Sequence, residues 1–586
     1  MSKAKRQNHM LLPGPWKMPL IGNLHQLVFS LPHRSLTDLA KKYGPIMQLQ
    51  LGEVLAIVIS SPKVAKEVMK THDAAFANRP NVLAVEVMSY DNSSLIFSRY
   101  NDYWRKMRKI LVTEFLSAKR IQSFKTIREE EVWNLIESIS SSYQGLQINF
   151  TEKMSSLTYG ITARAAIGKK CKYEKELISL IKETFILSGG FDVPDLFPSL
   201  KFLSFLTGTK PALEKMHRKL DRILDDIIKD HKKKRSSTSA SKHEGSDPED
   251  IVDVLLKLQE AGELDFNVTS NHIKAVTLDV FSGASETSAT MMEWTMSELL
   301  RNPRVMEKAQ AEVRRVLKGQ KNIDDVDIQK LDYLKLVVKE ILRLHPPAAL
   351  IPRESREKCE INGYEIPNNT KVFINAWAIG RDTEYWIDAD SFCPERFQGS
   401  LIDFKGTNFE FIPFGGGRRI CPGISFALAN IELFLSQLLY HFNWKLPNEI
   451  KPEELDMSES FGLSSSHPPR ATSPSATSNR TTTLPVPPAP APAPPATAPP
   501  PSPFQHPLRH RPLARQPTVP DPPLQTTAPP NHRASTSTRR QHPSPPDLSL
   551  SRIYLSEPSA HTIKSSFNDK PINEAAKARK FCICGD

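Results

Sequence analysis

One cysteine in this sequence stands in a setting that suits a metal-binding thiolate. Cys421 lies in the stretch FIPFGGGRRICPG, which has the pattern FxxGxRxCxG. A thiolate ligand needs a backbone that can approach it closely, which glycines allow, and it gains about 0.3–1 kcal/mol from the positive end of a following helix. The apolar run ISFALANIELFLSQLLYHF predicts that helix, with Pro422 in its first turn. The alternative is a buried structural cysteine beside a glycine-rich turn.

A second group of residues could move protons. The stretch DVFSGASETSATMMEW places Glu286 and Thr287 directly after two small residues and a serine, Gly283-Ala284-Ser285. A hydroxyl beside an acid can relay protons to a reacting group, and small side chains leave room for that group. A Ser/Thr-rich helix is otherwise usually one that faces solvent. This segment therefore indicates a proton relay only in combination with the cysteine motif.

The elements that must position these residues are mostly helical. Apolar residues recur at helical spacing over long segments such as 212–234 and 306–319. Short β-like runs occur at 46–60 and 359–382, and Asn362-Gly363 in the second run is a hairpin signal. The sequence therefore predicts a mainly α fold with a small β region.

Composition divides the chain near residue 463. Of its 48 prolines, 25 lie between Pro468 and Pro546, and the segment 464–586 carries +8 of the net charge of +12. Such a segment buries too little apolar surface to offset its ordering entropy, so we expect a disordered, low-complexity tail. Because the excess positive charge belongs mainly to this tail, it does not indicate nucleic-acid binding. The six cysteines are scattered, which argues against a disulfide framework. The sequence contains no run of 18 apolar residues, so it does not predict a transmembrane helix.

Residues 11–463 resemble the cytochrome P450 superfamily of haem-thiolate monooxygenases, and they look closest to plant microsomal family 71. The motifs WRKMR, GASET, EILR, PERF and PFGGGRRICPG stand in the family's order. The resemblance implies the cytochrome P450 fold, with haem b between the oxygen-binding helix and the cysteine-loop helix. It also implies that residues 1–10 are a basic remnant of a membrane-anchor linker. After Leu463 the family's closing C-terminal strands are replaced by the tail.

The resemblance assigns roles residue by residue. Glu286 and Thr287 would be the catalytic proton relay, although Ala284 stands where the family usually has glycine. Glu340, Arg343 and Arg396 would form a buried charge network with a structural role. Cys421 would be the metal ligand, and the haem-binding set would be Trp104, Arg108, Arg353, Phe414, Arg419, Cys421 and Gly423.

The resemblance implies insertion of one oxygen atom from O2 into a small lipophilic, terpenoid-like substrate. Electrons would come from NADPH through NADPH–cytochrome P450 reductase, since the chain holds no glycine-rich dinucleotide motif. The substrate pocket would be built from 80–103, 185–205, the first half of the oxygen-binding helix and 348–351. The expected location is the cytosolic face of the endoplasmic reticulum, with membrane association peripheral or lost, or else the cytosol, and we expect a monomer.

Two other functions stay open on the sequence. A haem-thiolate isomerase or dehydratase would need no reductase, but such enzymes typically lack the acid–threonine pair. An inactive or truncated product could instead bind partners through its proline-rich tail.

Overall fold

The structure is a computed structural model that describes residues 12–27, 30–141, 148–189, 192–238, 249–262, 266–318, 325–446, 450–459 and 475–478. The chain splits into two units, Met1–Val486 and Pro487–Asp586, and all described residues belong to the first unit. The predictions for residues 1–10, and for the tail apart from 475–478, therefore lie outside the described residues.

Helices dominate the described chain, as the sequence predicts. The α-helices are α1 (Pro32–Tyr43), α2 (Pro62–Lys66), α3 (Leu83–Met88), α4 (Asp102–Glu114), α5 (Ala118–Ser123), α6 (Lys125–Ser141), α7 (Phe150–Ile167), α8 (Glu174–Leu187), α9 (Val193–Leu196), α10 (Leu203–Leu206), α11 (Thr209–Thr238), α12 (Ile251–Ala261), α13 (Ser270–Phe281), α14 (Thr287–Arg301), α15 (Pro303–Val316), α16 (Asp325–Ile328), α17 (Asp332–Leu344), α18 (Ala376–Ile379) and α19 (Ile424–His441).

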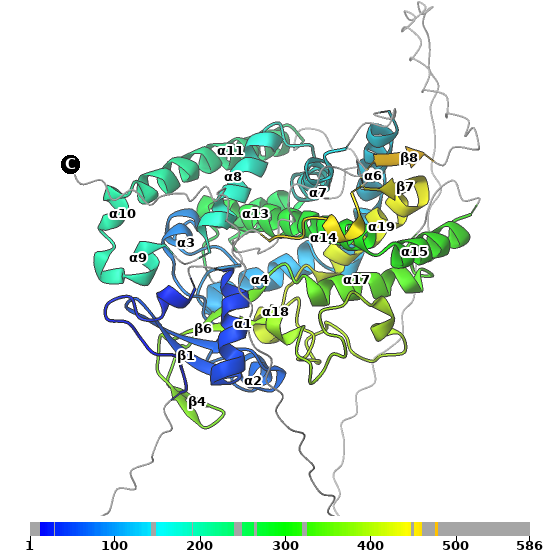
Figure 1. Cartoon of the computed structure of the whole chain (residues 1–586). Coiled ribbons are helices and arrows are strands. Elements are labelled where there is room, and N and C mark those ends of the chain that lie inside the picture. Colours follow the sequence, from blue (N-terminus) through cyan, green and yellow to red (C-terminus); the bar gives the residue numbers. More distant parts are fainter. Residues whose placement is uncertain are drawn as a thin grey trace, which may run out of the picture. The chain divides into compact units, whose positions relative to one another are not determined.

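The middle of the helical body is one long line of helix. It is made of α13, the π-helical turn η4 (Ser282–Glu286) and α14, and it runs through the centre of the view in Figure 1. Its α14 part contacts α7, α17 and α19, and η4 itself contacts α7. Packing on several sides explains why α14 is buried along almost its whole length.

A small mixed sheet stands beside the helices. Its strand order is β1 (Ile46–Leu51), β2 (Val54–Ile59), β6 (Lys371–Asn375) and β3 (Leu350–Glu354), which joins the first sixty residues of the chain to residues near 370. The β1–β2 and β3–β6 pairs are antiparallel, whereas β2 and β6 are parallel. The strands predicted at 46–60 are confirmed.

The predicted hairpin is also confirmed. Strands β4 (Cys359–Ile361) and β5 (Tyr364–Ile366) pair antiparallel across Asn362 and Gly363. Both turn residues have positive φ, at 50° and 80°, as a two-residue type I′ turn requires.

One strand pair involves the tail, which we expected to lack regular structure. Strand β7 (Phe442–Lys445) pairs antiparallel with β8 (Ser475–Ser478), from Phe442 opposite Ser478 to Lys445 opposite Ser475. This pair was not predicted, because the Ser-Ala-Thr-Ser segment has no alternating apolar pattern that would indicate a strand. Main-chain hydrogen bonds to β7 can nevertheless hold a polar segment in a strand.

Candidate active site

The cysteine motif forms a tight loop between the short 3-10 turn η6 (Gly417–Arg419) and α19. The Cys421 N–H donates to the carbonyl of Phe414 at 3.0 Å, which closes the loop. Gly417 has φ of +66°, and a Cβ there would overlap the carbonyl oxygen of Met69. Only glycine fits this position, because the loop rests directly on the neighbouring backbone.

The helix after the cysteine is confirmed, but the prediction for Pro422 is wrong. Helix α19 begins at Ile424 with Gly423 as its N-cap, so Pro422 precedes the helix instead of lying in its first turn. The reason is that Gly423, with φ of −92° and ψ of 12°, is not in the helical conformation. Its N–H points toward the Cys421 sulfur and acts to lower the pKa of the thiol.

Two positive groups face the Cys421 sulfur from different elements. Burial raises the pKa of the thiol, while the Gly423 N–H and the Arg108 guanidinium act in the opposite direction. Arg108, on α4, donates to the carbonyl of Ile420, the residue before the cysteine. The geometry thus holds a sulfur ligand beside a fixed cation, as a thiolate needs.

Four arginines gather beside this loop, and the one carboxylate that acts on them, Asp73, partly offsets the charge of Arg353 and Arg419 without a described hydrogen bond to either. Arg108, Arg353 and Arg419 were predicted for the haem-binding set, and the structure adds Arg79 to them. Burial is the first cause that lowers their pKa values, to about 10 for Arg353 and about 9 for Arg419, and the positive charges of neighbouring members lower these two and Arg79 further. Their hydrogen bonds within the described chain go to carbonyl oxygens and to no carboxylate.

The arginine cluster fits an anionic cofactor. Arg353 is 1% exposed, and its Nη1 has no hydrogen-bond partner in the described structure. A buried guanidinium with an unused donor is costly unless an anion completes it. The two propionates of haem have the required charge and hydrogen-bonding capacity, so the residues present fit haem beside Cys421.

The predicted Trp104 lies within the same cluster. Helix α4 starts at an Asn101 cap, whose side chain accepts the Trp104 N–H at 2.9 Å, and this places the indole toward the core. The ring centroid lies 4.3 Å from the Arg419 Cζ and 5.3 Å from the Arg108 Cζ. The face of the Trp104 ring therefore helps to hold two of the four guanidinium groups in place.

The predicted oxygen-binding motif coincides with the π-helical turn η4. Such turns are frequent at functional sites because they free a backbone carbonyl from the helix. Here the Thr287 hydroxyl donates to the carbonyl of Gly283 at 2.7 Å. A Cβ added at Gly283 would have only the Ile96 Cδ1 nearby, at 3.9 Å, so the backbone there borders open space. The threonine stands at the end of this turn, as the proton-relay prediction needs.

Glu286 points away from solvent. It is 1% exposed, and its charge adds to burial in raising the pKa of Tyr159 on α7. The structure thus brings Tyr159 to the candidate relay, although sequence reasoning missed it. A tyrosine in the mainly apolar run of α7 gave no local signal of this contact.

The predicted charge network around Glu340 is confirmed as a buried structural unit. Arg343 donates from Nε and Nη2 to the two Glu340 carboxylate oxygens, both at 2.8 Å, and Arg396 Nε donates to the same carboxylate at 2.9 Å. The remaining Arg343 donors reach the carbonyls of Gly380, Ala389 and Ser391. Since each charge has partners, this network stabilises the fold and does no chemistry.

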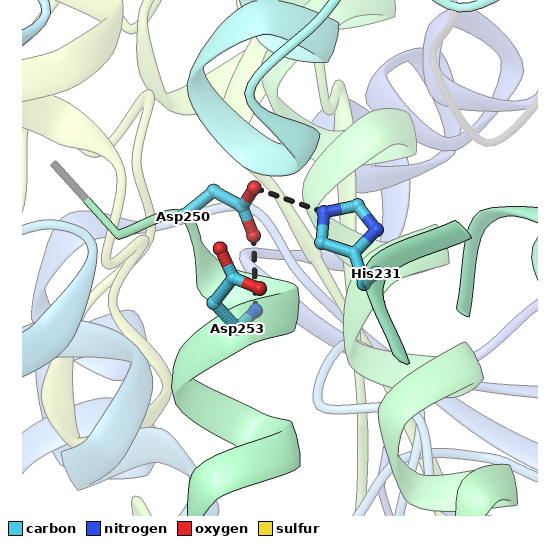
Figure 2. A group of neighbouring side chains, drawn as sticks. All are labelled: His231, Asp250 and Asp253. Atoms are coloured by element: carbon cyan, nitrogen blue, oxygen red, sulfur yellow. Dashed lines mark hydrogen bonds and ion pairs between the residues drawn. The ribbon is translucent and has the colours of Figure 1, made fainter. Parts of the chain in front are cut away.

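A second cluster of side chains resembles a metal site but serves another role. Within the described residues, His231, Asp250 and Asp253 place ligand atoms within 4.8 Å of one another (Figure 2). The His231 Nε2 contacts Asp250 at 3.0 Å, and Asp250 also accepts the Asp253 N–H at 3.0 Å as the N-cap of α12. Burial lowers the pKa of His231, but Asp250 outweighs this and raises it. Both Asp250 oxygens already accept hydrogen bonds within the chain, and the positive end of α12 disfavours a cation, so we interpret the cluster as a helix cap.

The fold and site together define a haem-thiolate protein, and comparisons with solved structures agree on the fold. A zebra fish cytochrome P450 structure with progesterone aligns with a TM-score of 0.65 at 24% identity, covering 77% of this chain and 100% of that chain. A second, with abiraterone, has a TM-score of 0.63 at 23% identity and covers 76% and 99%.

Sequence comparisons identify the family. The Cytochrome P450 family model matches residues 12–471. Melianol synthase of Ailanthus altissima is 58% identical over 77% of this chain and 87% of its own length. Desmethyl-deoxy-podophyllotoxin synthase of Sinopodophyllum hexandrum is 56% identical over 78% and 90%, and premnaspirodiene oxygenase of Hyoscyamus muticus is 52% identical over 78% and 91%. The chain therefore belongs to the cytochrome P450 family, whose members are monooxygenases that hold haem through an axial thiolate.

Proposed function

We propose that this protein inserts one oxygen atom from O2 into a small lipophilic, terpenoid-like substrate, with electrons from NADPH–cytochrome P450 reductase. The second oxygen atom leaves as water, and the two electrons come from NADPH. The observation that carries the proposal is the buried arginine cluster beside Cys421, whose described hydrogen bonds end on carbonyl oxygens and on no carboxylate. The cluster would hold the propionates of haem, and its member Arg108 faces the thiol of Cys421. Among the described thiols, Cys421 is the one that faces an arginine of this cluster.

Each predicted site residue then has a task. Cys421 would ligate the iron, with the Gly423 N–H near its sulfur and the Phe414 carbonyl fixing its loop. Trp104, Arg108, Arg353 and Arg419, joined by Arg79, would hold the propionates. When bound, the haem supplies the activation of dioxygen and the transfer of one oxygen atom.

The proton relay would be the work of the chain itself. The Thr287 hydroxyl donates a hydrogen bond to the Gly283 carbonyl. From this position it would donate a proton to a reacting group beside the open backbone of η4. Glu286 would resupply it, with Tyr159 next to its carboxylate. A buried acid and hydroxyl can pass protons without admitting bulk water.

The substrate class rests on the relatives and on the expected pocket. Two relatives carry the names melianol synthase and premnaspirodiene oxygenase, which favour a terpenoid-like substrate. One predicted pocket segment, 80–103, lies beside two of the other three. Leu83 N–H donates to Asp195, joining 80–103 to 185–205, and Ile96 faces Gly283 on the oxygen-binding helix.

A reduced carbon-monoxide difference spectrum tests haem-thiolate binding. The full chain, expressed with haem precursor, should give the thiolate-type band, and Cys421→Ser should lose it. Cys359→Ser is the matched control, because Cys359 is also a free cysteine but lies on β4, away from the arginine cluster. A chain without the band would contradict the proposal and favour the inactive, tail-binding product.

Turnover then separates monooxygenation from isomerisation. With reductase, NADPH and a panel of terpenoid alcohols and hydrocarbons, we expect a product that carries one oxygen atom from 18O2. Thr287→Ala should leave the difference spectrum in place while uncoupling NADPH use from product. Product formation without NADPH would show an isomerase or dehydratase instead.

We further propose peripheral association with the endoplasmic reticulum membrane. Within the described residues, no helix is long and apolar enough to span a bilayer. Large apolar side chains are exposed on two segments. One contains Leu20, which is 89% exposed, and the other contains Leu206, which is 78% exposed. Both segments meet the β1–β2 turn, where Gly52 N–H donates to Ile21 and Glu53 N–H donates to Leu196. An exposed apolar patch of this kind suits a lipid surface.

Flotation with phospholipid vesicles tests this association. The double variant Phe205→Ser, Leu206→Ser should reduce the vesicle-bound fraction at least about tenfold, given about 1.5–3 kcal/mol for each large apolar side chain. Leu401→Ser is the control, since Leu401 is 96% exposed but belongs to neither segment. Equal binding by both variants would refute the patch as the contact surface.

A further inference from the structure

A short segment links the oxygen-binding helix to the arginine cluster. Residues 93–98 lie between α3 and α4, within the region expected to border the substrate. On one side, the carbonyls of this segment accept hydrogen bonds from the cation cluster. Trp104 Nε1 donates to Leu95 at 2.9 Å, and Arg79 Nε donates to Ile96 at 3.1 Å.

Arg419 extends the same set of contacts. It donates from Nη1 to the Leu95 carbonyl at 3.3 Å and from Nη2 to the Ser98 carbonyl. The positions of Arg79 and Arg419 thus depend on where the 93–98 backbone lies. Any displacement of this segment would move two of the four guanidiniums that face the proposed propionate site.

The opposite side of the segment is held by one carboxylate, that of Asp279. It lies on α13, four residues before Gly283. The Ser94 hydroxyl donates to its Oδ1 at 2.7 Å, the Leu95 N–H donates to its Oδ2, and the backbone of Ile96 supplies a third hydrogen bond. Three donors converge on one side chain, so among the described hydrogen bonds Asp279 is the anchor of this segment on the oxygen-binding helix.

The surroundings of Asp279 increase the importance of these three hydrogen bonds. Burial raises the pKa of Asp279 to about 7, against which the hydrogen bonds act. Its charge also adds to burial in raising the pKa of Tyr103, whose hydroxyl donates to the Ser93 carbonyl at 2.8 Å. No arginine or lysine is among the groups that set the Asp279 pKa, so the donors of the segment are its main stabilisation.

We infer that Asp279 is a positioning residue for the site. By holding the amides of the 93–98 segment, it fixes the carbonyls that orient Arg79 and Arg419, and it places Ile96 opposite Gly283. The residue does not touch the reacting atoms. Its effect on cofactor retention rests on the proposed haem-binding function, whereas its effect on the segment does not.

Hydrogen exchange followed by mass spectrometry tests the inference directly. In Asp279→Asn the side chain keeps its shape but loses its charge and presents an N–H toward a donor. Exchange of peptides covering 93–98 should become at least about tenfold faster, and haem transfer from the holoprotein to excess apomyoglobin should accelerate by a similar factor. Asp279→Glu keeps the charge and should recover part of both effects.

Asp250→Asn provides a matched control. Asp250 is also buried and accepts one side-chain and one backbone donor, one backbone donor fewer than Asp279, but it caps α12. It should speed exchange around residues 250–253 and leave 93–98 and haem transfer unchanged. The inference is wrong if the 93–98 peptides of the Asp279→Asn variant exchange at the rate of the unmodified protein. It is also wrong if exchange in that variant becomes faster by the same factor throughout the chain.

Two further outcomes separate this inference from the proposed function. If Asp279→Asn does not fold, Ser94→Ala removes only one of the three donors and should speed exchange at 93–98 about threefold; no change would overturn the anchor. If the unmodified chain binds no haem, the proposed function fails, while the exchange comparison still decides the role of Asp279.

Discussion

Two groups of buried arginines in this protein differ in what balances their charge. Arg343 and Arg396 surround Glu340, whose carboxylate and nearby carbonyls occupy the donors. Arg353 and Arg419 are buried to a similar degree, yet their described hydrogen bonds end on carbonyls, and one Arg353 nitrogen has none. The first group has a hydrogen-bonded carboxylate within the chain, whereas the second has only the nearby charge of Asp73, and we propose that the propionates of haem complete it. Incomplete charge balance, more than burial, distinguishes the functional cluster from the structural one.

Breaking the complete group should have the largest effect. Replacing Arg343 by Met leaves the fully buried Glu340 with the partly exposed Arg396 as its remaining cation among the described residues, beside the N–H of Cys393. We expect a loss of about 3–5 kcal/mol in the free energy of unfolding. Urea unfolding followed by circular dichroism measures it, and a loss below about 1 kcal/mol would contradict the structural role.

The same substitution in the incomplete group should separate stability from cofactor binding. Arg353→Met removes a buried cation that makes one carbonyl hydrogen bond and no described hydrogen bond to a carboxylate. The haem-free protein should unfold at an unchanged or higher urea concentration, while haem affinity falls about 10- to 100-fold through loss of a charge-assisted hydrogen bond. Haem titration and urea unfolding of the same preparations check this. A parallel loss of both quantities would show that the two arginine groups are alike.

A third ion cluster extends the comparison to pH. Burial tends to raise the pKa of Glu459, but hydrogen bonds from His33 and Arg34 outweigh it and lower the pKa to about 2. A folded pKa below the unfolded value of about 4.3 means that this carboxylate stabilises the fold above pH 4.3, and that the contribution is lost as pH falls toward 2. We expect a loss of about 1–3 kcal/mol over that interval. In Glu459→Gln the unfolding free energy should already be lower at pH 6 and should depend less on pH.

An exposed pair should give the smallest effect. Lys41 and Asp38 lie one turn apart on α1, and both side chains are more than 70% exposed. Asp38→Asn should change the unfolding free energy by less than about 0.5 kcal/mol, because solvent screens such pairs. A change comparable to that of Arg343→Met would mean that burial does not set the size of these effects.

The sequence predicted the features that depend on neighbours along the chain. The Asn362-Gly363 turn, the helix after Cys421 and the Thr287 motif are local patterns, and each stands where it was expected. The structural role of Arg343 is predictable because the residues around it are apolar.

The features that the sequence did not reveal depend on contacts between distant residues. Arg79 lies in the run AFANRP and joins the cluster only because the chain folds residues 96 and 352 against it. Tyr159 meets Glu286 through the packing of α7 on η4. The π-helical form of η4 was also not predicted, since its composition differs little from that of an ordinary helix.

The π-helical turn η4 has a consequence for changes in chain length. A π turn holds one residue more than an α-helix of the same hydrogen-bonding span. Deleting one residue between Phe281 and Thr287 would restore a regular helix and keep the faces of α13 and α14 aligned, but deleting a second residue would rotate α13 by about 100° relative to α14. The second deletion would move Asp279 away from its partners at Ser94 and Leu95 while Thr287 kept its place. We therefore expect a single-residue gap within η4 to be tolerated better than a two-residue gap.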